Sequence, residues 1–103
     1  MLFRSKARRG EIVVIDVRPE DEYQAGHLPY ARSLPVAELR RRLDELPKNR
    51  PVVAYCRGPF CVMAGKAVAL LRKKGYRAWR LEDGVAEWRR NGLPVESKTG
   101  SAR

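Results

Sequence analysis

The sequence predicts an α/β domain with a central parallel sheet and helices on both faces. Short apolar runs alternate along the chain with segments of helical periodicity, so strands and helices follow each other in turn. The runs at residues 11–17 and 51–55 lack the polar alternation of a half-exposed strand, which is typical of strands buried on both faces. Because parallel strands need crossover connections, this alternating order favours a parallel sheet.

The first half of the chain predicts two strands, each followed by a helix. Residues 11–17 are rich in β-branched residues and predict the first strand. Residues 19–23 begin with proline and carry acids in their first turn, which predicts a short helix that Gly26 stops. Residues 31–34 predict a second short strand. The apolar spacing over residues 36–46 predicts an amphipathic helix that ends at the next proline.

The second half repeats this order and contains the longest predicted helix. Residues 51–55 predict a buried strand that runs directly into a cysteine-containing loop. Residues 62–74 predict a long helix, because they are rich in Ala, Val and Leu, end in cations and are followed by Gly75. Residues 76–81 alternate like a strand, and residues 84–90 predict a last short helix.

The length and composition predict a single domain. A chain of 103 residues can bury one hydrophobic core but not a second. Hydrophobic residues make up 44% of the chain and charged residues 33%, which are ordinary proportions for a folded domain. We expect one folded domain at residues 11–96, preceded by a basic lead at residues 1–10 and followed by a flexible tail at residues 97–103.

The formal net charge of +10 favours small anionic ligands or an acidic protein partner. The basic residues fall mostly on predicted helix faces and helix ends, so they do not by themselves predict nucleic-acid binding. The longest apolar run, residues 12–15, is too short to cross a membrane, and the basic lead lacks the apolar core of a signal peptide. We therefore expect a cytoplasmic protein without membrane contact.

The two cysteines, Cys56 and Cys61, lie too close together in the sequence to form a disulfide framework of the secreted kind. A structural zinc site needs four ligands, and the chain offers these thiols and the single histidine, His27. We therefore expect no metal. Redox chemistry, nucleophilic chemistry and simple burial remain as explanations of the two thiols.

Cys56 follows the predicted strand at residues 51–55, and ligands of parallel sheets bind at the carboxyl ends of the strands. The loop after Cys56 leads into a helix N-terminus, where backbone N–H groups and the helix dipole favour an anion. Both effects lower the pKa of a thiol and stabilise a thiolate or persulfide, and Arg57 adds a nearby cation. The alternative is that Cys56 is a small buried apolar residue.

Four segments of the chain carry a recognisable pattern. Residues 16–31 read Asp-Val-Arg-Pro-Glu-Asp-Glu-Tyr-Gln-Ala-Gly-His-Leu-Pro-Tyr-Ala, residues 33–35 read Ser-Leu-Pro and residues 55–61 read Tyr-Cys-Arg-Gly-Pro-Phe-Cys. The fourth segment comprises Gly75, Tyr76, Leu81, Gly84, Trp88 and residues 92–94. Together they resemble the rhodanese family across residues 10–96, with Tyr30 where a glycine is usual.

The resemblance implies a rhodanese-like fold and a sulfurtransferase. Cys56 matches the family's nucleophile, which takes a sulfane sulfur from a donor such as thiosulfate or polysulfide and holds it as a persulfide. A thiol or a cyanide-like acceptor then takes the sulfur. The substrate-binding loop would consist of Arg57, Gly58, Pro59, Phe60, Cys61 and Val62. Because this chemistry needs only the thiolate and the loop amides that hold the persulfide, the resemblance implies no cofactor.

Asp16 and Arg18 resemble the family's pair at the end of the first strand, which supports the loop and the first helix. The favoured interpretation of the two residues is a structural ion pair or a capping contact. His27, next to Gly26, is interpreted as a packing residue without a catalytic role.

The loop departs from the family at Cys61 and Val62, where many relatives carry an arginine or other polar residue and then serine or threonine. One loop cation is therefore missing, which makes a donor other than thiosulfate plausible. The loop also resembles that of rhodanese domains fused to winged-helix repressors of the arsenic-sensing type. Cys61 itself has two interpretations: a resolving thiol that attacks a Cys56 persulfide, or a small residue packed at the helix start.

Two other functions compete with sulfur transfer. A loop-cysteine phosphatase or arsenate reductase would need an arginine that closes the loop and an acid for the leaving group. After Arg57 the next arginine is Arg72, at the far end of the predicted helix, which disfavours this class. The second alternative is a rhodanese module that senses redox state or sulfide, or binds a partner, without turnover.

Overall fold

The computed structural model describes residues 2–58, 61–81 and 84–96. Its centre is a sheet of four strands: β1 (Val13–Asp16), β2 (Ala31–Ser33), β3 (Val52–Tyr55) and β4 (Ala78–Arg80). Their order in the sheet is β2-β1-β3-β4, and each neighbouring pair is parallel. The predicted parallel α/β fold is therefore confirmed. The predicted flexible tail, residues 97–103, lies outside the described residues.

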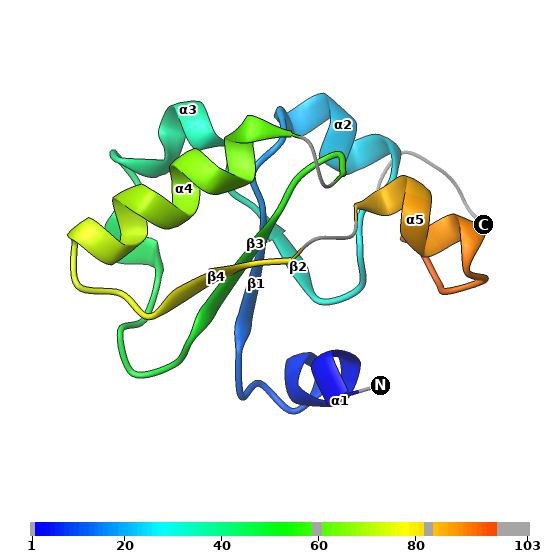
Figure 1. Cartoon of the computed structure of the whole chain (residues 1–103), viewed down its shortest axis with the longest axis horizontal. Helices are drawn as coiled ribbons and strands as arrows, with labels where there is room; N and C mark the ends of the chain where they lie inside the picture. Colours follow the sequence, from blue (N-terminus) through cyan, green and yellow to red (C-terminus); the bar gives the residue numbers. More distant parts are fainter. Residues whose placement is uncertain (1, 59–60, 82–83, 97–103) are drawn as a thin grey trace.

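Helices cover both faces of this sheet (Figure 1). One face carries α3 (Val36–Leu39) and α4 (Val62–Lys73), and the other carries α1 (Leu2–Arg8), α2 (Glu20–Ala25) and α5 (Val85–Arg90). Residues 2–8 of the basic lead thus form a helix, which packs Ala7 onto the sheet. None of the described helices is long and apolar enough to cross a membrane.

Two apolar clusters fill the space between the sheet and its helices. The first joins β1, β3 and β4 to the buried side of α4, and its members include Ile15, Val52, Ala54, Ala67 and Leu71. The second lies on the opposite face, and its members include Val14, Tyr23, Tyr55, Val85 and Trp88. Successive residues of one strand thus point into different clusters, which is why the strands read as continuous apolar runs in the sequence.

The helix predicted over residues 36–46 is wrong in length. The structure has only α3, then a turn, then a 3-10 helix at Leu43–Glu45. Pro47 offers no N–H to the carbonyl of Leu43, and the residue before a proline is driven towards an extended conformation. The Tyr76 hydroxyl instead donates to the Leu43 carbonyl at 2.8 Å, and Leu46 is extended. The contact with Tyr76, 33 residues away, was not visible in the local pattern.

Helix α4 begins directly after the cysteine loop and has a well-defined end, as predicted. Gly75 adopts a left-handed conformation with φ of 92°. Its N–H donates to the Arg72 carbonyl at 3.1 Å, and the N–H of Tyr76 donates to the Leu71 carbonyl at 3.0 Å. This pair of bonds is the Schellman motif, which satisfies the last carbonyls of a helix. Helix α4 is therefore held at its far end, and its other end faces the loop.

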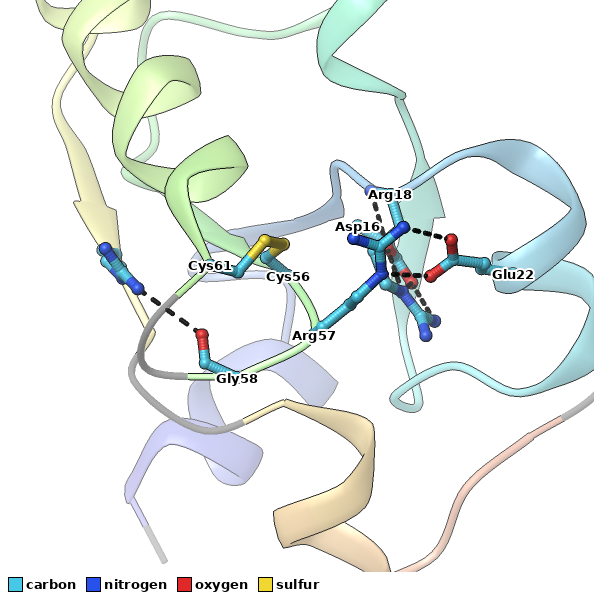
Figure 2. The surroundings of a disulfide bond; sticks show 8 residues. Asp16, Arg18, Glu22, Cys56, Arg57, Gly58 and Cys61 are labelled. Carbon is cyan, nitrogen blue, oxygen red and sulfur yellow. Dashed lines mark hydrogen bonds and ion pairs between the residues drawn. A yellow bond between two sulfur atoms is a disulfide. The ribbon is translucent and has the colours of Figure 1, made fainter.

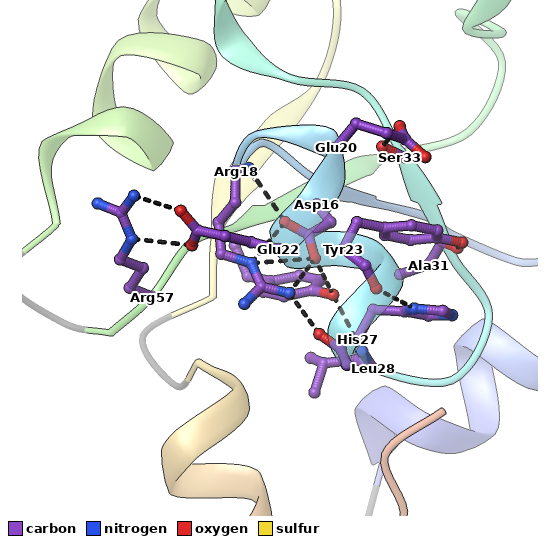
Figure 3. A network of polar contacts seen from close by, with 12 residues as sticks. Asp16, Arg18, Glu20, Glu22, Tyr23, His27, Leu28, Ala31, Ser33 and Arg57 are labelled. Carbon is purple, nitrogen blue, oxygen red and sulfur yellow. Dashed lines mark hydrogen bonds and ion pairs between the residues drawn. The ribbon is translucent and has the colours of Figure 1, made fainter. Parts of the chain in front are cut away.

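A buried polar network joins the carboxyl ends of β1 and β3 (Figure 3). The Asp16 carboxylate is fully buried and accepts hydrogen bonds from Arg18 Nε at 2.9 Å and from the Tyr55 hydroxyl at 2.7 Å. Arg18 Nη2 also donates to the Gly26 carbonyl at 2.6 Å, and Tyr55 accepts from the Leu28 N–H at 3.0 Å. The network therefore ties both strand ends to the segment that follows α2.

The protonation states of Tyr55 and Arg18 in this network are set by burial and by Asp16. Burial, and then the charge of Asp16, raise the pKa of Tyr55 well above its ordinary value, so the hydroxyl stays a donor. Burial opposes the charge of Arg18, but the hydrogen bonds and charge of Asp16 outweigh it and raise the pKa of Arg18. Asp16 thus has a permanent cation and a permanent hydroxyl donor as partners.

The start of α5 makes a close backbone contact with the loop after β3. A Cβ added to Gly84 would lie 2.1 Å from the Arg57 carbonyl oxygen and 2.8 Å from that of Cys56. Both are backbone atoms, so no side chain can turn away to relieve the clash. The backbone of Gly84 itself has ordinary dihedral angles. Position 84 therefore requires glycine because there is no room for a Cβ. The close contact also limits the path of the loop after β3.

We predict that Arg18→Ala lowers the free energy of unfolding by about 3 kcal/mol or more, because it leaves the buried Asp16 without its cation. Tyr55→Phe should cost about 1 to 3 kcal/mol, because it removes only a hydroxyl. Denaturant titration at neutral pH measures both losses. Arg9→Ala is the control, since Arg9 pairs with Glu11 on the exposed surface and its removal should leave the midpoint close to that of wild type. An unchanged midpoint in Arg18→Ala would contradict the prediction.

We predict that Gly84→Ala destabilises the domain, because a Cβ there collides with the loop backbone. Gly65→Ala in α4 is the matched control, since its Cβ would meet only the flexible Arg80 side chain at 3.7 Å. Removing a glycine from a helix interior should stabilise by about 0.5 to 1 kcal/mol. Thermal melting of the two variants should therefore give shifts of opposite sign, and equal shifts would contradict the role given to Gly84.

Candidate active site

Cys56 lies at the carboxyl edge of the sheet, directly after β3 (Figure 2). Its side chain is 1% exposed and belongs to the apolar cluster beneath α4. The preceding residue, Tyr55, is the one held by Asp16. The polar network therefore determines where the chain leaves the sheet, and so where the sulfur of Cys56 lies.

The sulfur atoms of Cys56 and Cys61 are joined in a disulfide, with 6.3 Å between the two Cα atoms. Both cysteines of the chain are thus in this bond. Cys61 is only half-buried and packs against the edge of the same apolar cluster. The two interpretations of Cys61 are therefore not exclusive: it packs at the helix start, and its sulfur still reaches that of Cys56.

Cys61 is also the N-cap residue of α4, so the disulfide holds the Cys56 sulfur beside the first turn of the longest helix. That first turn contains no acidic residue, and the positive end of the helix dipole favours a thiolate or persulfide anion there. The Cys61 N–H donates to the Gly58 carbonyl at 3.2 Å, which curls the loop. Val62, the first residue of α4, is 65% exposed. Pro59 and Phe60, two residues of the predicted substrate-binding loop, lie outside the described residues.

The Arg57 side chain extends from the loop to α2, where it pairs with Glu22 (Figures 2 and 3). Arg57 Nε donates to one carboxylate oxygen at 2.9 Å, and Nη2 donates to the other at 2.5 Å. The hydrogen bond and the opposite charge lower the pKa of Glu22 and raise that of Arg57. The pair is largely exposed, so it is a weak and reversible link between loop and helix. Sequence reasoning assigned Arg57 to an anionic substrate and missed Glu22.

A second cation reaches the loop from the end of β4. Arg80 Nη2 approaches the Gly58 carbonyl oxygen at 3.4 Å. On the other side, the Glu87 carboxylate of α5 accepts the Gly84 N–H at 2.9 Å and lies against Gly58. The hydrogen bonds that the Glu87 carboxylate accepts from the backbone N–H groups of Gly84 and of Glu87 itself lower the pKa of Glu87. Sequence reasoning missed both side chains, although Arg80 ends a parallel strand and the ends of parallel strands meet at one edge.

Asp16 pairs with Arg18 (Figure 3) and accepts the hydrogen bond of the Tyr55 hydroxyl, the residue before Cys56, so the pair supports the strand end as expected for a structural ion pair. His27 is buried, stacks on the Tyr23 ring at 3.8 Å between centroids, and its Nδ1 is 2.7 Å from the Tyr23 carbonyl oxygen. These contacts hold α2 against the segment that follows it. In the described part of the chain, no group of three or more His, Cys, Asp or Glu side chains is placed to hold a metal ion.

Among the described residues, hollows lie next to α4 and next to α2. A mainly apolar one of about 300 Å³ lies beside the first turn of α4, lined by Val17, Pro19, Pro35, Val36, Ala37, Glu38 and Met63. A smaller one of about 160 Å³ lies between α2 and α5, lined by Arg18, Glu22, Ala25, Gly26, Val85 and Arg89.

Known proteins resemble this chain over most of its length. The chain is 55% identical, over 87 residues, to the HTH-type transcriptional regulator Rv0324 of Mycobacterium tuberculosis, and the match covers 84% of the chain but 38% of the regulator. A protein named sulfurtransferase from Allochromatium vinosum is 35% identical over 91 residues, which cover 87% of the chain and 83% of that protein.

A solved structure and a family model agree with these matches. The BH2092 protein of Bacillus halodurans superposes with a TM-score of 0.83 at 31% identity, and the match covers 95% of this chain and 74% of that one. The family model described as the rhodanese-like domain matches residues 2–91. The parallel sheet, the cysteine loop at its carboxyl edge and this match over most of the sequence make the chain a member of the rhodanese-like domain family.

Proposed function

We propose that the protein is a sulfurtransferase that carries a sulfane sulfur as a persulfide on Cys56. The observation that carries the proposal is the position of the Cys56 sulfur, at the end of β3 and beside the N-terminus of α4. A thiolate there is favoured by the helix dipole and by nearby cations. The same features favour the persulfide anion. The relative named sulfurtransferase, which matches the chain over most of both lengths, supports the proposal.

The proposed cycle starts from the reduced protein, because the Cys56–Cys61 bond blocks the nucleophile. The Cys56 thiolate attacks the outer sulfur of thiosulfate, a bond forms between the two sulfurs, and sulfite leaves with the electron pair of the broken bond. Cyanide or a thiolate then attacks the outer sulfur of the persulfide, and Cys56 leaves as a thiolate. Each step is a displacement at sulfur, so neither step needs a cofactor.

The charges around the loop favour an anionic donor. The exposed Arg57 side chain can exchange its half-buried partner Glu22 for a donor oxygen, since the link is open to solvent. Arg80 adds a cation from β4, close to Gly58. It supplies positive charge near the loop position where Cys61 stands in place of the arginine or other polar residue of many relatives. Thiosulfate, polysulfide and other small sulfur anions are therefore the proposed donors.

A second candidate function is a redox-sensing or sulfide-sensing module without turnover. The disulfide between Cys56 and Cys61 favours it, because a loop that opens and closes with oxidation is a natural sensor. The match to part of a transcriptional regulator also favours it. The two functions differ in turnover: a transferase passes many sulfur atoms per chain to cyanide, whereas a sensor takes up one sulfur or forms one disulfide and stops.

The first test is intact-mass analysis of reduced protein after exposure to thiosulfate or polysulfide, followed by a cyanolysis assay. At the earliest time points we expect wild type to carry one added cyanide-labile sulfur, and with cyanide present from the start we expect it to form thiocyanate repeatedly. Cys56→Ser should gain none and lose activity, because an alcohol forms no persulfide, while its thermal melt should stay close to that of reduced wild type. Activity retained by Cys56→Ser would remove Cys56 from the mechanism. Sulfur uptake without turnover would favour the sensor.

The second test separates a donor-binding role of Arg57 from a structural one. If Arg57 binds the donor, Arg57→Ala should lower kcat/KM for thiosulfate about tenfold at low salt and change that for a neutral trisulfide little. Glu22→Gln should keep or raise thiosulfate activity, because it releases the guanidinium. If Arg57 only fastens the loop to α2, both variants should lose activity equally with both donors. Both variants keep Cys56, so a change in activity reports on donor binding or on loop position and not on loss of the nucleophile.

A further inference from the structure

The two sulfurs of the loop lie in different surroundings on rigid supports. Cys56 ends a central strand and is 1% exposed, whereas Cys61 caps α4 and is half-buried. Their Cα atoms lie 6.3 Å apart, within the 4.4 to 6.8 Å range that a disulfide allows. The polar network holds the strand end, and the Schellman motif and the apolar cluster hold α4. The sulfur of Cys61 therefore stays within reach of that of Cys56 after reduction.

We propose that Cys61 is a resolving thiol, which turns a Cys56 persulfide into a disulfide and releases its outer sulfur as sulfide. This inference rests on the proposed function, because it requires the persulfide, and it adds a second outcome for the bound sulfur. The protein would then reduce sulfane sulfur as well as transfer it. The substrates of this activity are a sulfane-sulfur donor and a dithiol reductant.

The proposed step balances without an outside oxidant. The Cys61 sulfur attacks Sγ of the Cys56 persulfide, and the bond between the two cysteine sulfurs forms. The bond from Cys56 Sγ to the outer sulfur breaks, and the outer sulfur leaves with the electron pair. The proton of the Cys61 thiol ends on the departing atom, which becomes hydrosulfide. The sulfane sulfur is reduced by two electrons, and the two cysteines are oxidised to the disulfide.

The structure also indicates how the disulfide is reopened. A dithiol must attack one of the two sulfurs, and the half-buried Cys61 is more accessible than the fully buried Cys56. The reductant therefore forms its mixed disulfide with Cys61, and Cys56 leaves as the thiolate beside the first turn of α4. The second thiol of the reductant then displaces Cys61. This order returns Cys56 to the form that accepts the next sulfur.

The experiment compares wild type with Cys61→Ser, both fully reduced and freed of reductant without air. Serine is a favoured N-cap residue, so the substitution should preserve α4. Cys61→Ala is the second variant, in case the serine hydroxyl disturbs the loop. Each protein receives one equivalent of polysulfide, and intact mass and free sulfide are followed over time. Dithiothreitol added at the end tests whether the cycle resets.

We expect wild type to release one sulfide per chain more than the Cys61 variants, whose only sulfide comes from the donor's own leaving group, and to lose the mass of two hydrogens. The Cys61 variants should keep the mass of one extra sulfur at least about tenfold longer, because attack by a neighbouring thiol is lost. Persulfides with equal lifetimes in all three proteins, without a disulfide in wild type, would overturn the resolving role and leave the proposed function standing. If no protein takes up sulfur from polysulfide or thiosulfate, the proposed function fails, and the resolving role fails with it.

Discussion

The buried carboxylate of Asp16 is the constraint on which the arrangement of the site depends. A charge removed from water must have a cation and hydrogen-bond donors around it, and here Arg18 and the Tyr55 hydroxyl supply them. These partners come from the ends of β1 and β3, and Arg18 also binds the carbonyl of Gly26 after α2. Because Cys56 is the next residue after Tyr55, the geometry that satisfies the carboxylate also sets the position of the reactive sulfur.

The described residues of the cysteine loop are contacted by three other elements. Gly84 at the start of α5 approaches its backbone so closely that no Cβ fits, Arg80 reaches it from β4, and Glu22 holds Arg57 from α2. The first contact is backbone packing and is rigid, whereas the two arginine contacts are side-chain interactions that an anion can replace. In the proposed function, this combination of a fixed loop path and exchangeable cations serves to capture a small anionic sulfur donor.

The disulfide connects the chemistry of the site to the redox state of its surroundings. With the bond closed, the Cys56 sulfur is blocked, and sulfur transfer in the proposed form requires reduction first. In the proposed cycle, the closed bond is therefore an inactive form that must be reduced before sulfur uptake, and it is also the product of the proposed resolving step. In a compartment rich in dithiols the open form dominates, so the same loop links sulfur uptake to the supply of reductant.

The sequence by itself determined the parallel α/β fold, the order of its elements and the position of Cys56 at a strand end, because these follow from local periodicity and from the turn and helix signals that flank the loop. It could not determine the contacts that cross between elements. Local apolar spacing predicts one helix over residues 36–46, but Pro47 and the distant Tyr76 hydroxyl produce a short helix and a 3-10 turn instead.

Other features likewise depend on distances between segments that are remote in the chain. They are the pairing of Arg57 with Glu22, the approach of Arg80 to the loop and the need for glycine at position 84. Only the tertiary structure decided these features, because side-chain reach and backbone clearance are properties of the packed elements and leave no periodic signal in any one of them.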